Sequence, residues 1–235
     1  MKNTLLPLFA FLLSFNMFTQ TSAEYYNSGI AKFDLEDYRG AISVFSKAIE
    51  LNPNNSAAYG FRGLSKAKLG DYNGAMSDYN KAIEINPNEP ASYGNRGALK
   101  DKLGDNRGAI LDYTKVIEIN PNDEYAYQQR GICKANLEDY RAAILDFNKA
   151  IEINPNDENA YRNRGIIKGY LKDNKGSILD FSKAIEINPN YDKAYFNRGV
   201  SKWRLKQFKS ACEDWRKAEE LGHPTASNEI RKLCN

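Results

Sequence analysis

An Asn-Pro pair recurs through the chain at a fixed interval, and this interval constrains the fold more than any other feature of the sequence. The pair occurs at 52–53, 86–87, 120–121, 154–155 and 188–189, so every spacing is 34 residues. Repetition at a period of about 20 to 50 residues is typical of proteins built from stacked units. The sequence therefore predicts an array of small units in place of one compact core.

Other positions keep the same register and define the unit. Tyrosine forms the first column: Tyr25, Tyr59, Tyr93, Tyr127, Tyr161 and Tyr195. Glycine forms the second: Gly29, Gly63, Gly97, Gly131, Gly165 and Gly199. Small residues form the third: Ala41, Ala75, Ala109, Ala143, Ser177 and Ala211. Aromatic residues form the fourth: Phe45, Tyr79, Tyr113, Phe147, Phe181 and Trp215. Within each half of the unit the apolar columns lie three or four residues apart, which is the spacing of one helix face.

Each unit is therefore predicted to be two helices joined by a tight polar turn, such as Gly70-Asp71. Proline cannot continue a helix, so the second helix should end just before Pro53 and its equivalents. We expect the asparagine after each proline to cap the next helix: Asn54, Asn88, Asn122 and Asn156. The glycine of the first helix is expected to face the small residue of the second, with the aromatic side chain beside them. One such pair cannot bury its own apolar face, but stacked neighbours can.

At this point the columns resemble the tetratricopeptide repeat. Tyr, Gly, Ala, an aromatic residue, Ala and Pro recur at that family's spacing, as between Ala58-Tyr59 and Pro87, and the resemblance extends from Ala23 to about Pro224. It implies an all-α fold, a right-handed α-solenoid of six helix-turn-helix repeats. The predicted repeats are 24–55, 56–89, 90–123, 124–157, 158–191 and 192–225, and residues 226–235 are predicted to form a short C-terminal cap.

The family typically binds extended peptides or partner proteins along a concave groove lined by the first helices. Carried over to this chain, the groove candidates are the residues just after each column tyrosine: Asn27, Phe61, Asn95, Gln128, Gln129, Arg162, Asn163, Phe196 and Asn197. Asparagine and glutamine amides can donate to and accept from a peptide backbone. Trp203 is a further apolar candidate. The alternative interpretation is that these side chains are only solvated.

Two further columns change together from copy to copy. Arginine precedes the glycine in the last five repeats, and aspartate precedes the aromatic residue: Arg62 and Asp78, Arg96 and Asp112, Arg130 and Asp146, Arg164 and Asp180, Arg198 and Asp214. The first repeat lacks both, with Ser28 and Val44 in their places. We therefore predict an Arg–Asp contact between the two helices of one repeat, a setting in which the planar guanidinium is favoured over lysine. The alternative is that the arginines line the groove.

Lysine occupies a column where the family often has an aromatic residue: Lys32, Lys66, Lys100, Lys134, Lys168 and Lys202. The column could bind an anion. The preferred interpretation is that each aliphatic stem packs on the helix pair while the ammonium group reaches water.

The N-terminal segment differs from the repeats. Residues 1–23 contain a single charge at Lys2, an apolar run from Leu5 to Phe15 and a small residue at Ala23. This order predicts a secretory signal peptide cut near Ala23 and export to the periplasm or the medium, although an uncleaved anchor is the alternative. The apolar run is short for a membrane span, which takes about 20 residues. No integral membrane segment is expected in the mature chain.

Three cysteines are present. Cys212 occupies a column that faces the following repeat, and the tail helix expected at Ala226–Leu233 would cover this face and bring Cys234 near. In an oxidising compartment we predict a Cys212–Cys234 bridge; the alternative is one buried and one frayed thiol. Cys133 is expected to be a packed free thiol.

No pattern in the sequence indicates catalysis. The chain has one histidine, His223, without a surrounding base-and-orienter pattern, and it has no metal-ligand spacing and no phosphate-binding glycine loop. We therefore expect no enzyme activity, no cofactor and no metal. The net charge of +3 gives little drive toward nucleic acid. The predicted function is a scaffold or assembly factor that binds a protein or peptide. The alternatives are a self-assembling structural protein and, more distantly, an RNA-binding helical repeat.

Overall fold

The computed structural model describes residues 20–234, which form thirteen α-helices and no strand. The first twelve helices make six antiparallel pairs: α1 (Ser22–Asp34) with α2 (Tyr38–Leu51), α3 (Ser56–Lys68) with α4 (Tyr72–Ile85), α5 (Pro90–Lys102) with α6 (Asn106–Ile119), α7 (Glu124–Asn136) with α8 (Tyr140–Ile153), α9 (Glu158–Tyr170) with α10 (Asn174–Ile187), and α11 (Asp192–Arg204) with α12 (Phe208–Glu220). The last helix is α13 (Ala226–Leu233). The predicted all-α solenoid of helix pairs is confirmed.

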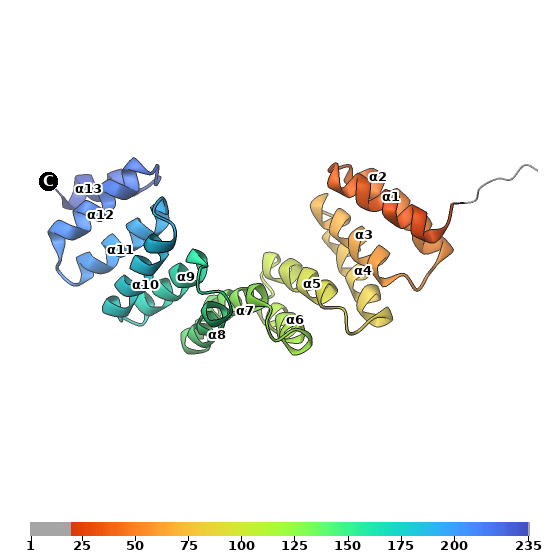
Figure 1. Ribbon diagram of the computed structural model, residues 1–235, viewed down its shortest axis with the longest axis horizontal. Coiled ribbons are helices and arrows are strands. Elements are labelled where there is room, and N and C mark those ends of the chain that lie inside the picture. The colour runs from red at the N-terminus through yellow and green to blue at the C-terminus, as the bar shows by residue number, and fades with distance from the viewer. Residues whose placement is uncertain (1–19, 235) are drawn as a thin grey trace, which may run out of the picture.

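The pairs stack into an arch in which both ends rise on the same side of the middle repeats (Figure 1). Around the middle of the arch, α5, α7 and α9 lie on the inner side and α6, α8 and α10 on the outer side. From α1 to α11, successive odd-numbered helices contact one another as well as their partners, whereas within residues 20–234 successive even-numbered helices make no comparable contacts. The inner surface is therefore a continuous row of the odd-numbered helices from α1 to α11, which we call the inner helices.

The core consists of one buried aromatic side chain in each repeat, surrounded by alanines. Phe45, Tyr113 and Trp215 are examples of this aromatic column, and all of its members are buried. The expected glycine–alanine contact needs a correction, because the glycine lies directly against the aromatic ring. A Cβ added at Gly63 would lie 2.9 Å from the Tyr79 ring and 3.2 Å from the Ala75 carbonyl oxygen. The absence of a side chain therefore makes room for the ring, and the alanine contributes mainly its backbone.

The caps expected from the residue after each proline are wrong by one position. Asn54, Asn88, Asn122 and Asn156 lie in the turns, and their backbone N–H groups donate to the side chain of the Asn-Pro asparagine two residues earlier. The next residue caps the helix: Asn55, Glu89, Asp123 and Asp157. The turn that contains the proline is therefore one residue longer than predicted.

The first helix begins before the predicted first repeat. The α1 helix begins at Ser22, and its cap is Thr21, which exchanges hydrogen bonds with Glu24. The Ser22 hydroxyl also donates to the Ala48 carbonyl oxygen at 2.8 Å. The cleavage predicted near Ala23 falls within this first turn, whereas residues 1–19 of the predicted signal peptide lie outside the described residues.

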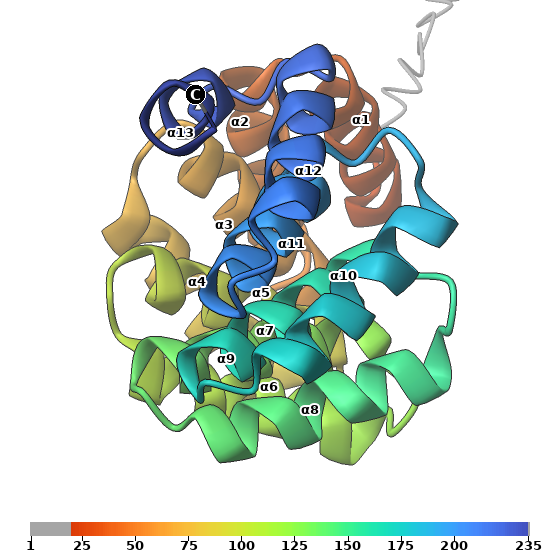
Figure 2. The ribbon, with the colours of Figure 1, turned by 90° about the vertical axis from the view of Figure 1, so that its left-hand side faces the viewer.

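The C-terminal end of the array is covered by α13, which lies beside α12 (Figure 2). Cys212 of α12 is joined to Cys234 by a disulfide with a Cα–Cα distance of 5.7 Å. Ile230, Leu233 and Cys234 pack against the cluster of Ala211, Cys212 and Trp215. The last full repeat therefore has an apolar face that a short helix closes. No helix within residues 20–234 has the length and apolar character to cross a membrane.

We predict that the bridge stabilises this cap. Cys234→Ser should lower the free energy of unfolding by about 3 kcal/mol, because the bridge closes a loop whose ends are 22 residues apart. The measurement is urea unfolding with and without a thiol reductant. The reductant should lower the stability of the wild type and leave the stability of Cys234→Ser unchanged. Equal stability of the wild type and Cys234→Ser without reductant would contradict the prediction.

Candidate functional site

A charged cluster joins the two helices of each of the last five repeats. In the fourth repeat, Arg130 Nε lies 3.0 Å from Asp146 Oδ2, and Arg130 Nη2 lies 2.7 Å from Asp146 Oδ1. This two-point contact matches the planar guanidinium to the carboxylate. The other pairs have the same geometry: Arg62–Asp78, Arg96–Asp112, Arg164–Asp180 and Arg198–Asp214.

The lysine column belongs to the same clusters, which corrects the expectation that its ammonium groups reach water. Lys134 Nζ lies 2.7 Å from Asp146 Oδ2, and the Asp146 side chain is only 4% exposed. Lys66, Lys100, Lys168 and Lys202 make the same contact in their own repeats. Only the first repeat differs, because Val44 offers no carboxylate and Lys32 pairs with Asp37 at 3.0 Å. The column therefore neutralises buried aspartates.

The arginine also reaches the preceding repeat. Arg130 Nη1 donates to Thr114 Oγ1 on α6 at 3.1 Å, and its guanidinium lies 5.5 Å from the centre of the Tyr127 ring. The acceptors in this column are all hydroxyl or amide oxygens: Ser46, Asn80, Thr114, Asn148 and Ser182. Sequence interpretation missed this column, although its 34-residue spacing was visible. One guanidinium thus connects two repeats.

The predicted groove residues fall into two groups. Asn27, Asn95, Gln129 and Asn197 lie on inner helices at one register, and their side-chain amides make no hydrogen bond within residues 20–234. Asn163 holds the same register and accepts a hydrogen bond from Arg162 Nη1 at 3.1 Å. This group presents polar atoms that a ligand can use.

The second group is engaged within the protein. Phe61 stacks on the buried Phe45 ring at 5.8 Å, and Phe196 stacks on His223 at 4.1 Å. The amide nitrogen of Gln128 donates to Glu124 and to Asp157, so two carboxyl groups lie around it. These side chains therefore already have partners within the protein.

The Glu124 carboxyl group has a perturbed acidity. Burial raises the pKa of Glu124, and a hydrogen bond with the neighbouring Asp157 carboxyl group raises it further. Arg162 is also constrained, because its Nε is buried without a hydrogen-bond partner. The fourth and fifth repeats therefore contain polar groups in unusual surroundings.

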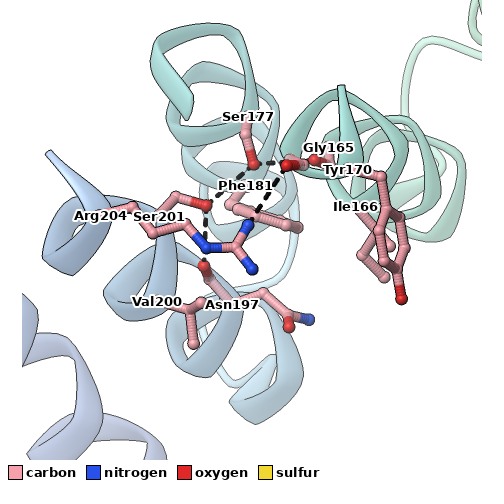
Figure 3. A pocket seen from close by; sticks show the side chains of 10 residues that line it. Gly165, Ile166, Tyr170, Ser177, Phe181, Asn197, Val200, Ser201 and Arg204 are labelled. Atoms are coloured by element: carbon pink, nitrogen blue, oxygen red, sulfur yellow. Dashed lines mark hydrogen bonds between the residues drawn. The ribbon is translucent and has the colours of Figure 1, made fainter. Parts of the chain in front are cut away.

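Three hollows follow the inner surface, one between each successive pair of inner helices from α5 to α11. The first lies between α5 and α7, has a volume of about 290 Å³ and is lined by Asn95. The second lies between α7 and α9, has a volume of about 310 Å³ and is lined by Asn163. The third lies between α9 and α11, has a volume of about 120 Å³ and is lined by Asn197 (Figure 3). Each hollow therefore combines apolar walls with one asparagine of the same column.

Metal-ligand clusters and the free cysteine are two features of the described residues that bear on chemistry. Within residues 20–234, no group of three or more His, Cys, Asp and Glu side chains is arranged to hold a metal ion. Burial raises the pKa of the free Cys133 thiol to about 12, with a smaller contribution from Asp101. Cys133 therefore stays protonated and is a poor nucleophile at neutral pH.

The fold and the inner hollows define an α-solenoid with a repeated inner surface. Models described as tetratricopeptide repeat match residues 22–55, 90–123 and 124–157, and one described as TPR repeat matches residues 63–104. The chain is a member of the tetratricopeptide-repeat proteins. No curated protein matches the chain.

Solved structures share this architecture. MamA from Desulfovibrio magneticus RS-1 is 21% identical, with a TM-score of 0.68 over 74% of this chain and 98% of that chain. YrrB, described as a TPR protein with an unusual peptide-binding site, is 21% identical, with a TM-score of 0.68 over 80% of this chain and 98% of that chain. PilF from Pseudomonas aeruginosa is 12% identical, with a TM-score of 0.76 over 90% of this chain and 96% of that chain. At these identities the comparison shows the fold.

We predict that the charged cluster stabilises the array. Arg130→Ala should lower the free energy of unfolding by about 2–3 kcal/mol, because Asp146 keeps only Lys134 and Thr114 loses its donor. Thermal and urea unfolding measure the effect. Arg141→Ala is the matched control, since Arg141 lies in the same repeat, is exposed and has no partner within residues 20–234. Unchanged stability with loss of binding would assign the arginine to the groove instead.

Proposed function

We propose that the protein is a non-catalytic scaffold that binds an extended peptide, or an extended segment of a partner protein, along its inner surface. The observation that carries this proposal is that each of the three hollows is lined by an asparagine of the same column: Asn95, Asn163 and Asn197. Each hollow can accept a side chain, while the amide beside it can donate to and accept from the peptide backbone.

The repeated geometry supports an extended ligand over a compact one. The inner helices contact one another in sequence from α1 to α11, so the hollows follow one path along the array. An extended chain advances about 3.3 Å per residue, so one segment can cross several repeats with its side chains alternating toward and away from the surface. The peptide-binding site named for YrrB, which has the same fold, is consistent with such a ligand.

The proposed place of action is the exported space. The charge, apolar run and small residue in residues 1–23 support a cleaved signal peptide. The Cys212–Cys234 bridge is also consistent with an oxidising compartment.

The triple variant Asn95→Ala, Gln129→Ala and Asn163→Ala tests the groove. It should lose the bound partner, because it removes backbone-binding amides from three adjacent repeats while leaving the charged clusters intact. The measurement is a pull-down from the exported fraction, quantified by mass spectrometry, with melting curves to show that the variant remains folded.

A control triple variant removes the same groups elsewhere. Asn88, Asn122 and Asn156 lie in exposed turns, and their side chains make no hydrogen bond within residues 20–234. Changing these to alanine should leave capture unaffected. Retention of the partner by the groove variant, or equal loss in both variants, would contradict the proposal.

A further inference from the structure

Two of the three hollows are adjacent and share a wall. The hollow between α7 and α9 and the hollow between α9 and α11 are both lined by Ile166 and Tyr170 of α9. Tyr170 is 63% exposed, so its ring stands at the surface between the two hollows. A ligand that crosses α9 therefore meets both hollows within a few residues.

The larger hollow is suited to an apolar side chain. The rings of Tyr140 and Tyr170 are parallel within 3° and lie 5.5 Å apart at its edge. Ile132, Ile166 and Phe147 supply further apolar surface, and the volume is about 310 Å³. A bulky apolar side chain that enters this space exchanges water for apolar contact on several sides, which is favourable.

The smaller hollow contains a guanidinium group. Arg204 extends from α11 toward α9, where its Nη1 donates to the Gly169 carbonyl oxygen at 3.2 Å (Figure 3). The space exists because Gly169 has no side chain and because Ser177 and Ser201 are small. A Cβ at position 169 would already lie 3.5 Å from Arg204 Nη1. Every other repeat has a larger residue than glycine at this register: Phe33, Ala67, Asp101, Ala135 and Trp203.

Arg204 differs from the arginines of the charged clusters because it has no anionic partner. Within residues 20–234 no carboxylate pairs with Arg204, whereas each cluster aspartate is already occupied by an arginine and a lysine. On the same inner surface, Arg162 Nε is buried without a partner. The fifth and sixth repeats also carry an excess of positive charge, since residues 158–225 contain 14 Lys and Arg but only 9 Asp and Glu. A carboxylate is therefore the ligand group that complements this hollow.

We propose that the inner surface of the fourth to sixth repeats recognises a peptide in which an acidic residue lies beside a bulky apolar residue. The apolar side chain enters the Tyr140–Tyr170 hollow, and the carboxylate binds Arg204 across the Tyr170 wall. This inference rests on the proposed peptide-binding function and adds the chemical class of the peptide.

Selection from a phage-displayed library of random peptides tests the proposal. The purified wild-type protein should enrich peptides with Asp or Glu within two residues of Leu, Ile, Met, Phe, Tyr or Trp. Enriched peptides are then synthesised with a fluorescent label in two forms, the selected acid and its Asp→Asn or Glu→Gln counterpart, and binding is measured by fluorescence anisotropy. Arg204→Gln should weaken binding of the acidic form about tenfold and leave the neutral form unchanged.

Two further variants separate the causes. Gly169→Leu should weaken both forms by filling the smaller hollow while keeping Arg204. Arg141→Gln removes one unpaired cation from the outer helix α8 and should change neither form. Melting curves show whether each variant is folded.

The outcomes distinguish this inference from the function beneath it. If the selected peptides lack an acidic residue and the Asn95, Gln129 and Asn163 triple variant no longer binds them, the inference is overturned. The proposed peptide-binding function would still hold. Equal weakening of both peptide forms by Arg204→Gln would also overturn the inference. Arg204 would then affect binding only by holding the end of α9 in place, and not by pairing with the carboxylate of the peptide. The absence of any groove-dependent peptide would overturn both.

Discussion

The guanidinium group in each of the last five repeats is the contact on which the array depends. It binds a buried aspartate of its own repeat through two nitrogens and donates its third to a hydroxyl or amide oxygen of the preceding repeat, as Arg130 does with Asp146 and Thr114. Burying a carboxylate is costly unless it is paired and hydrogen-bonded. Here each aspartate receives an arginine and a lysine, so the carboxylate is satisfied. The first repeat has no preceding repeat to bind, and its aromatic contacts, such as Phe45 with Phe61, replace the cluster.

On each of these helices, the side chains that hold the repeats together and the side chains proposed to bind a ligand occupy different positions. In each of the last five repeats, the arginine, the lysine and the column tyrosine of the inner helix belong to the charged cluster. The neighbouring asparagine register points elsewhere and remains available, as Asn95 and Asn197 show. Because the clusters connect successive repeats, they also help to set the spacing of the hollows between inner helices. A ligand that crosses several repeats therefore meets a surface whose spacing is held by buried charge.

Much of the fold could be predicted because the same residues recur at every repeat. Six copies of one pattern give the helix pairs and their stacking, and the joint absence of Arg and Asp from the first repeat indicated their contact. The lysine contact was not predicted, since a lysine stem on a helix face is equally consistent with a solvated head until the position of Asp146 is known. The caps were misplaced by one residue because the length of a proline turn depends on its backbone geometry. The hollow beside Arg204 combines residues of α9, α10 and α11, and no repeating pattern marks it, because the columns of Gly169 and Arg204 vary from repeat to repeat.

The central claim is that the arginine couples one repeat to the next, and a double-mutant cycle between Arg130 and Thr114 tests it most directly. The free energy of unfolding is measured in urea for the wild type, Arg130→Ala, Thr114→Val and the double variant. The account predicts an interaction energy of about 0.5–1.5 kcal/mol across the repeat boundary. Effects that add to within about 0.3 kcal/mol would contradict it, because the cluster would then stabilise single repeats without joining them.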